Sequence, residues 1–218
     1  INIKIKANSS VGIVGKTGAG KSTFGNLLLG LLKPTSGSIK VNGEHIDTDE
    51  KILNWQKNIS FVPQNLFLLE SSIKKNIAFT LNEDSIDKNK LVQSCEIAQL
   101  TDFINQQKDG LETMVGEKGI KLSGGQQQRI GIARAIYNNT DILFFDEATS
   151  ALDGVTEEKV INSIKKENNK TIFLISHNFS TIKNCELIIF FDKGEIVKSG
   201  TYKELLENSS FKQLSEVS

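Results

Sequence analysis

A glycine-rich segment near the start of the chain has the residue types and spacing that bind a nucleoside triphosphate. Its sequence is Gly15-Lys16-Thr17-Gly18-Ala19-Gly20-Lys21-Ser22, which fits the pattern G-x-x-x-x-G-K-[ST] at every position. The glycines let backbone N–H groups surround an anion without Cβ clashes. Lys21 is expected to reach the β- and γ-phosphates, the Ser22 hydroxyl to hold Mg²⁺, and Thr23 to add a phosphate contact. These residues predict an ATP and Mg²⁺ site.

Two acids at the end of an apolar run form a second candidate site. Residues 142–145 are large and apolar, and Asp146 and Glu147 follow them directly. Because burying a bare charge is costly, such carboxylates need partners, and a Mg²⁺ ion near the phosphates would supply one. We assign Asp146 to Mg²⁺ and Glu147 to the general base that activates the attacking water. The alternative is a strand end capped by two solvated acids.

A second anion-binding arrangement lies further along the chain. The segment Leu122-Ser123-Gly124-Gly125-Gln126 places a hydroxyl and two glycines at the start of an expected helix. This segment resembles the signature sequence of ATP-binding cassette (ABC) proteins. The resemblance implies a head-to-tail dimer, in which Ser123 to Gln126 of one copy close over the nucleotide held by the other copy.

Other segments follow the order found in the same family. Gln64, after Phe61-Val62-Pro63, resembles the glutamine that senses Mg²⁺ and the attacking water. The segment Ser150-Ala151-Leu152-Asp153 is similar to the loop that crosses the dimer interface, so Asp153 is expected at the nucleotide site of the dimer. His177 resembles the histidine that contacts the γ-phosphate. A lone histidine at a strand end is usually structural, so this role depends on the resemblance.

Three segments favour the exporter type within this family. They are residues 72–79, 113–119 and 177–182. The chain departs from the usual pattern at Asn178 and Phe179, beside His177, and has Thr140 where relatives commonly carry proline. None of these changes removes a catalytic group, so ATPase activity is still expected.

The resemblance also implies partners and a location. These are a second ABC domain, a homodimer being expected, and a transmembrane domain of the same full-length chain, at the cytoplasmic face of the cell membrane. The apolar segment 65–69 is interpreted either as core packing or as a docking surface for helices of that membrane domain. The function expected from the resemblance is the ATPase motor of an exporter or lipid-linked-molecule flippase. Residues 52–57 are in addition similar to a segment of bacterial glycolipid flippases.

The start of the chain suggests a longer protein. Ile1 is not a natural first residue, and residues 1–14 contain no aromatic side chain. The resemblance implies an aromatic residue that stacks on adenine, which is therefore expected upstream of Ile1. Cys95 and Cys185 have no metal-type spacing, which favours a reducing compartment without a structural disulfide.

Two other classes of function remain as alternatives. One is a soluble ABC ATPase acting on nucleic acid or ribosomes, and the other is a nucleotide-dependent interaction module without turnover. The balance of 26 basic and 26 acidic residues gives no field that would attract nucleic acid, so no nucleic-acid partner is expected. DNA-repair relatives carry long coiled coils between the two loops, and no heptads occur here. A binding-only module would not need Glu147 and His177.

The elements that must position these residues indicate an α/β fold. Residues 1–7, 11–14, 38–41 and 59–62 are expected to be strands, with Asn42-Gly43 as a turn between the last two. Buried parallel strands are expected at residues 142–145, 171–175 and 187–191. Helices are expected at residues 21–32, ended by Pro34, and at 91–104 and 157–166, with a loop leading into a helix at 124–136.

This order predicts a P-loop NTPase core with a mainly parallel sheet, a small antiparallel β part near the N-terminus and an inserted helical subdomain. The whole chain, residues 1–218, is interpreted as one ABC-type ATP-binding domain. Its catalytic core is assigned to residues 1–83 and 138–218, and the helical subdomain with the signature to residues 84–137.

Overall fold

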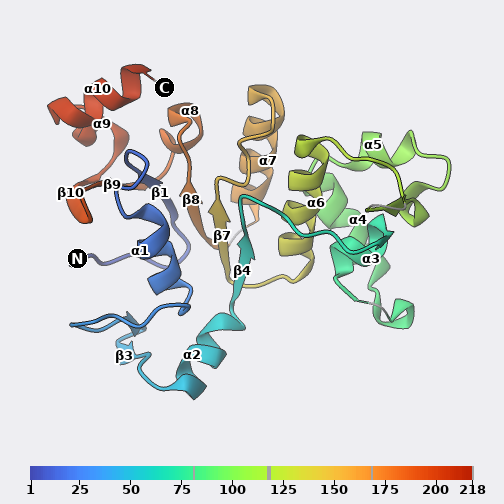
Figure 1. Ribbon diagram of the computed structural model, residues 1–218, viewed down its shortest axis with the longest axis horizontal. Helices are drawn as coiled ribbons and strands as arrows, with labels where there is room; N and C mark the ends of the chain where they lie inside the picture. Colours follow the sequence, from blue (N-terminus) through green and yellow to red (C-terminus); the bar gives the residue numbers. More distant parts are fainter. Residues whose placement is uncertain (81, 117–118, 168, 218) are drawn as a thin grey trace. The chain divides into compact units, whose positions relative to one another are not determined.

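The computed structural model describes residues 1–80, 82–116, 119–167 and 169–217 (Figure 1). These residues form two compact units. The first contains Ile1–Ser60, Thr140–Asp146 and Asn169–Ser218, and the second contains Phe61–Asn139 and Glu147–Asn168. The helical subdomain expected at residues 84–137 falls within the second unit, and its status as a separate domain stays a prediction.

A mainly parallel six-stranded sheet organises the first unit. Its strand order is β10-β9-β1-β8-β7-β4. The strands are β1 (Ser10–Val14), β4 (Ile59–Val62), β7 (Ile142–Asp146), β8 (Thr171–Ile175), β9 (Leu187–Asp192) and β10 (Glu195–Gly200). β1 runs parallel to β8 and β9, and β7 runs parallel to β8, whereas the outer strand β10 is antiparallel to β9. The register of β10 shifts between Ile196 and Lys198, which marks a β-bulge.

Continuous apolar runs explain why the central strands are buried on both faces. Every residue of β1 and β8 is buried, as expected for inner strands of a parallel sheet. Aromatic rings fill the core beside them: Phe24 packs on Phe191 with ring centroids 5.0 Å apart, and Phe144 packs on Phe173 at 5.4 Å. The predicted α/β fold with a mainly parallel sheet is confirmed.

The helices of the first unit are α1 (Lys21–Leu28), α2 (Asp49–Gln56), α8 (Phe179–Ile182), α9 (Tyr202–Leu205) and α10 (Ser209–Val217). The expectation that the first helix would continue to residue 32 and stop at Pro34 was wrong. The chain instead turns at Gly30, which has a φ of +68°. A Cβ atom at Gly30 would lie 3.0 Å from Ile52 Cγ2, so both the backbone angle and the packing of α2 end α1 early.

The antiparallel part near the N-terminus is a short hairpin of β2 (Lys40–Val41) and β3 (Glu44–His45). Asn42 and Gly43, both with positive φ, form its turn as predicted, but the strand after the turn is β3 rather than residues 59–62. Residues 1–7 do not form the expected strand. Ile3 and Ile5 pack against the core, yet no described strand pairs with this segment, and a strand exists only through such pairing.

The second unit is mainly helical. It contains α3 (Ile73–Ala78), α4 (Lys88–Ile97), α5 (Thr101–Asn105), α6 (Gly124–Tyr137) and α7 (Gly154–Lys166), the short strands β5 (Ser71–Ser72) and β6 (Met114–Val115), and two 3₁₀ turns, η1 (Glu83–Ser85) and η2 (Gly110–Glu112). α3 and α4 pack against α6 (Figure 1). The run predicted to be helical at residues 91–104 is two helices, because Gln99 has a φ of +55° and breaks it.

In the described part of the chain, no helix is both long enough and apolar enough to cross a membrane.

Candidate functional site

The phosphate loop connects β1 to α1 in the first unit. β1 ends at Val14, and α1 begins at Lys21 with Gly20 as its N-cap, at a φ of +102°. No side chain caps this end of α1, and the N-terminus of a helix favours the binding of an anion. Lys21 is buried, and its Nζ donates to the carbonyl oxygens of Gly15 at 2.7 Å and Lys16 at 3.2 Å. The lysine is therefore held inside the loop.

Packing requires glycine at Gly15 of this loop, whereas at Gly20 a φ of +102° adds to a tighter than usual contact. A Cβ atom at Gly15 would lie 2.3 Å from the carbonyl oxygen of Phe191, and one at Gly20 would lie 3.2 Å from the Cα of Gly194. Gly18 differs, because a Cβ atom there meets nothing within 4 Å and only its φ of +80° favours glycine. The turn between β9 and β10 supports the loop, since Gly194 N donates to Ala19 O at 3.0 Å.

The parallel strands bring the phosphate loop, Asp146 and His177 to the same edge of the sheet. Ile175 of β8 is in register with Ile13 of β1 on one side and with Asp146 of β7 on the other. The phosphate loop follows β1, Asp146 is the last residue of β7, and His177 lies two residues beyond β8. Ligands of parallel α/β sheets bind at the carboxyl ends of the strands, and all three groups lie at those ends.

Glu147, in the second unit, has an unusual backbone conformation. Its φ is +50°, which a side chain other than glycine rarely adopts. Gln64 Nε2 donates a hydrogen bond of 2.8 Å to Glu147 Oε2. The structure therefore joins two of the three predicted catalytic residues and places them on segments far apart in the sequence.

Gln128 supports the loop that follows Glu147, and the sequence analysis did not identify it. This buried side chain of α6 donates from Nε2 to the carbonyl oxygen of Glu147 at 3.4 Å and to Ser150 Oγ at 3.1 Å. Its Oε1 accepts from Ala151 N at 2.8 Å. The position of Gln128, four residues after Gly124 and on the same helix face, is the signal that could have revealed it.

The signature segment begins α6 with a reciprocal cap. Ser123 Oγ accepts from Gln126 N at 3.2 Å, and Ser123 N donates to Gln126 Oε1 at 2.8 Å. The hydroxyl acts only as an acceptor in this cap, so its hydrogen can still be donated to a phosphate oxygen. A Cβ atom at Gly125 would lie 2.9 Å from Ala151 O, which explains the glycine there.

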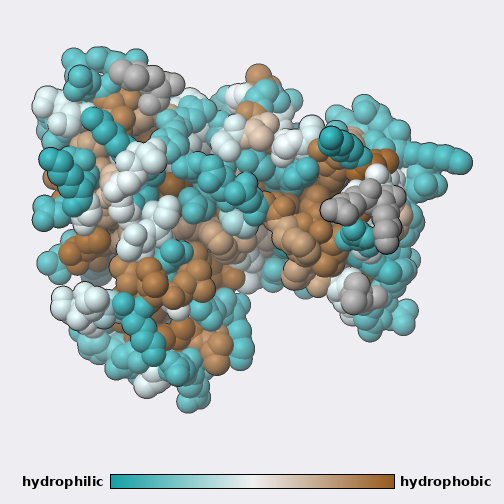
Figure 2. Space-filling view, viewed as in Figure 1, coloured by the Kyte–Doolittle hydropathy of each residue, from teal (hydrophilic) through white to brown (hydrophobic). Residues whose placement is uncertain are grey.

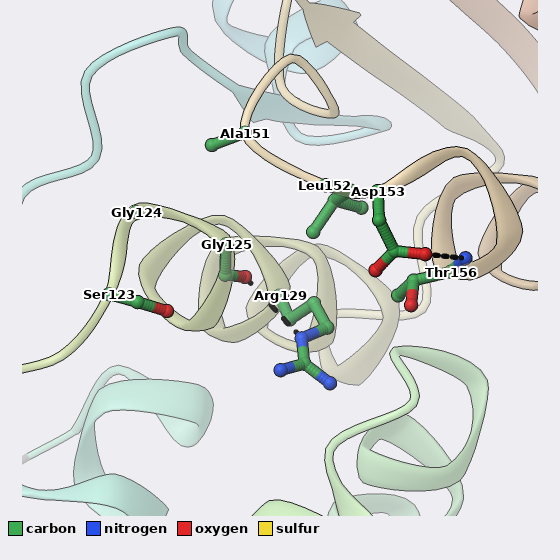
Figure 3. Close-up of a pocket in the computed structure, with 8 residues that line it drawn as sticks. All are labelled: Ser123, Gly124, Gly125, Arg129, Ala151, Leu152, Asp153 and Thr156. Carbon is green, nitrogen blue, oxygen red and sulfur yellow. Dashed lines mark hydrogen bonds between the residues drawn. The ribbon is translucent and has the colours of Figure 1, made fainter.

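The signature segment lines a pocket of about 290 Å³ in the second unit, shown in Figure 3. It is lined by Ser123, Gly124, Gly125, Arg129, Ala151, Leu152, Asp153 and Thr156. Asp153 caps α7, because its Oδ1 accepts from Thr156 N at 3.0 Å, and this bond lowers the pKa of Asp153. Burial lowers the pKa of Arg129, whereas the charge of Asp153 acts to raise it. The predicted residues Ser123, Gly124, Gly125 and Asp153 thus share one pocket.

Arg129 was also missed by the sequence analysis. Its Nη1 donates to Gln99 O at 2.6 Å and its Nε donates to Gly125 O at 3.4 Å. It therefore ties the signature segment to the break between α4 and α5. Arginine four residues after Gly125, on the same helix, is the pattern that could have indicated this contact.

The apolar segment at residues 65–69 is only partly packed. Leu66 lies against α6, where a Cβ atom at Gly131 would be 2.9 Å from Leu66 Cδ1, whereas Phe67 is 70% exposed. Phe79 and Met114 are also exposed, and Figure 2 shows apolar side chains gathering over α6 and the chain before α3. Leu66 is therefore packed as the core alternative expects, and the docking of Phe67 to a membrane domain stays a prediction. Glu117 and Lys118 of the exporter-type segment 113–119 lie outside the described residues.

Comparisons with known proteins agree with this geometry. The fold and the loop between β1 and α1 define a P-loop nucleotide-binding protein, and the family described as ABC transporter matches residues 1–150. The chain belongs to that family. The leukotoxin translocation ATP-binding protein LktB of Mannheimia glucosida is 42% identical over 212 residues, which are 96% of this chain and 29% of that protein. LktB of Bibersteinia trehalosi is 41% identical over 212 residues, again 96% of this chain and 29% of that protein.

A solved structure has the same fold. It is described as a bacterial Atm1-family ABC exporter with ATP bound, and it matches with a TM-score of 0.88 and 34% identity, over 97% of this chain and 37% of that chain. The chain thus spans about a third of the length of the proteins it matches.

Proposed function

We propose that this chain binds and hydrolyses ATP as the motor domain of an ABC exporter. The hydrogen bond between Gln64 and Glu147 carries the hydrolysis part of the proposal, because it joins a carboxylate, which follows Asp146 directly in the sequence, to an amide that can orient it. The similarity to LktB and to the Atm1-family exporter supports the exporter assignment over a flippase.

ATP is held by its phosphates in this proposal. The N–H groups of residues 15–23 surround the triphosphate, with Thr17, Lys16 and Thr23 exposed around it. Lys21 neutralises charge on the β- and γ-phosphates once its Nζ exchanges the carbonyl oxygens of Gly15 and Lys16 for phosphate oxygens.

The donor set fits Mg²⁺. The described residues contain no cluster of three or more His, Cys, Asp or Glu side chains that would form an all-protein metal site. Ser22, Asp146 and Gln64 offer a hydroxyl, a carboxylate and an amide oxygen, and Mg²⁺ prefers few oxygen ligands of this kind together with phosphates and water. When bound, the ion neutralises charge on the phosphates.

Hydrolysis assigns one role to each remaining side chain. Glu147 accepts a proton from the water that attacks the γ-phosphorus, while the bond between that phosphorus and the β-phosphate oxygen breaks and ADP leaves. Gln64, which donates to Glu147, orients that carboxylate and the water. His177, exposed at the end of β8, donates to the γ-phosphate as charge develops on it. The left-handed backbone at Glu147 is a strained conformation of the kind that occurs at functional sites.

The signature pocket contributes in a second copy. Ser123, the N–H groups of Gly124 and Gly125, and Gln126 close over the γ-phosphate held by the partner domain, and Asp153 lies beside them. The further partner is a transmembrane domain, which places the chain at the cytoplasmic face of the cell membrane.

Phosphate release from MgATP tests the proposal. The chain is expected to turn over ATP, to stop when EDTA removes Mg²⁺, and to lose turnover in Lys21→Ala. Lys33→Ala is the matched control, because Lys33 is an exposed lysine paired with Asp49. Equal turnover by Lys21→Ala and the wild type would overturn the proposal.

A further inference from the structure

We propose that Phe211, in helix α10, is a positioning residue for His177 and acts through Phe179. The inference rests on the proposed role of His177 at the γ-phosphate. Phe211 is fully buried, with 0% of its surface exposed, and lies at the centre of an aromatic cluster in the first unit.

The cluster connects α10 to the segment that carries His177. The ring of Phe211 meets the ring of Phe179 edge to face, with centroids 5.3 Å apart and an interplanar angle of 72°. It makes similar contacts with Phe190 of β9 at 5.6 Å and Tyr202 of α9 at 5.7 Å. Phe211 therefore joins the histidine segment to the sheet and to α9 at one point.

Only one residue separates His177 from Phe179, so a shift of the ring is transmitted to the histidine. The residue between them is itself held by hydrogen bonds: Asn178 N donates to Ser176 Oγ at 3.0 Å, and Asn178 Oδ1 accepts from Ser180 N at 3.0 Å. His177 is exposed, whereas Ser176 and Phe179, on either side of it, are 8% and 7% exposed. The exposed histidine is thus held between two buried anchors, and Phe211 supports one of them.

Removal of the Phe211 ring would leave a cavity beneath Phe179 and allow the start of α8 to move. A displacement of about 1 Å in a catalytic group can reduce a rate roughly a hundredfold, while the phosphate loop that grips ATP is untouched. The expected signature is a loss in kcat with little change in KM for ATP.

Nuclear magnetic resonance gives a readout that does not depend on activity. The chain has two histidines, so the imidazole Hε1 signals of His177 and His45 are easily distinguished. Phe211→Ala is expected to shift the His177 signal and to leave the His45 signal in place, and the milder Phe211→Leu is expected to shift it less. Leu205→Ala, which also truncates a fully buried residue but in α9, is the control.

An unchanged His177 signal in Phe211→Ala, or an equal shift in Leu205→Ala, would overturn the inference. If Phe211→Ala does not fold, the comparison of Phe211→Leu with Leu205→Ala decides in the same way.

A double-mutant cycle provides the kinetic test. Phe211→Ala alone is expected to lower kcat about tenfold or more, but to have no further effect in a His177→Ala background, because it acts through that side chain. Additive losses in the double variant would contradict the inference. Undiminished turnover by His177→Ala would instead contradict the proposed function, while the magnetic resonance result would still decide whether Phe211 positions the histidine.

Discussion

Gln64 and Glu147 are 83 positions apart in the sequence, yet Gln64 Nε2 and Glu147 Oε2 lie 2.8 Å apart in a hydrogen bond. The amide donates and the carboxylate accepts, which fixes the orientation of both groups. The bond uses the nitrogen of the Gln64 amide and not its carbonyl oxygen, the atom that a Mg²⁺ ion requires. In the proposed mechanism, the Gln64 side chain therefore uses its nitrogen for Glu147 and its oxygen for the Mg²⁺ ion.

Replacement of Glu147, the proposed general base, is expected to separate ATP binding from ATP turnover. Glu147→Gln is nearly isosteric, so we expect steady-state ATP hydrolysis to be abolished while MgATP binding is retained and the ATP-bound dimer accumulates. Phosphate release, nucleotide titration and light scattering measure the three properties. Glu158→Gln, at an exposed glutamate of α7, is the matched control and should behave as the wild type. A Glu147→Gln protein that stays monomeric with saturating MgATP and turns over normally would contradict the assigned role.

If two copies of the chain share each nucleotide site, two different inactive variants should restore activity when they are mixed. Lys21→Ala removes the lysine proposed to bind the phosphates, and Ser123→Arg removes the hydroxyl of the signature segment, so each variant should be inactive alone. Their mixture contains one composite site with Lys21 from one copy and Ser123 from the other, and we expect nucleotide-driven association and partial activity that rises with concentration. Each variant at twice its concentration is the control. A mixture that neither associates nor hydrolyses ATP would count against sharing.

A buried hydrogen bond beside the site should contribute to stability. Thr149 Oγ1 donates to Glu157 Oε1 at 2.6 Å, and both residues are 5% exposed. Glu157→Ala leaves the threonine hydroxyl without this acceptor, so we expect the free energy of unfolding to fall by about 1–3 kcal/mol. Urea unfolding measures the change. The exposed neighbour provides the control, since Glu158→Ala should change stability by less than about 0.5 kcal/mol.

The exposed carboxylate of Glu83 forms ion pairs with Lys74 and Lys75, and these are expected to give the stability of the second unit a dependence on pH. A hydrogen bond from Lys74, with a weaker effect from Lys75, lowers the pKa of Glu83 from 4.5 to about 2. A carboxylate with a lowered pKa in the folded state stabilises the fold above pH 4.5, and this contribution is lost as the pH falls from 4.5 towards 2. Glu83→Gln should therefore lose less stability than the wild type over that interval.

Chemical denaturation at several pH values measures this difference, and Asp84→Asn is the neighbouring control. Because the Glu83 carboxylate is exposed, added salt should reduce the difference between wild type and Glu83→Gln. Parallel pH profiles for these two proteins at low salt would show that the ion pairs have no role.

The elements that the sequence predicted well are those with a strong local signal. The buried strands at residues 142–145 and 171–175 were predicted from continuous apolar runs, because runs that are this short and rich in β-branched and aromatic residues favour an inner parallel strand. The end of α1 was predicted poorly. Its stop depends on the φ of Gly30 and on contact with Ile52, which is distant in sequence, and not on Pro34.

For the candidate site, the motifs predicted the identity of the functional residues but not the hydrogen bonds that position them. The loop at residues 15–23 was located from its pattern, and the structure shows the carbonyl partners of Lys21. The supporting residues Gln128 and Arg129 were missed because their partners are distant in the sequence. Gln128 donates to the carbonyl oxygen of Glu147, and Arg129 donates to the carbonyl oxygen of Gln99. Contacts between residues so distant in the sequence produce no local pattern from which they could be predicted.

The bulge in β10 has a consequence for how copies of the chain can meet. β10 is the outermost strand on its side of the sheet, and an outer strand with a regular row of backbone donors and acceptors can recruit a strand from another molecule. The register shift between Ile196 and Lys198 interrupts that row, and Lys198, paired with Glu207 at 3.1 Å, places a charge beside it. Copies of the chain are therefore discouraged from pairing edge to edge through β10 into extended sheets.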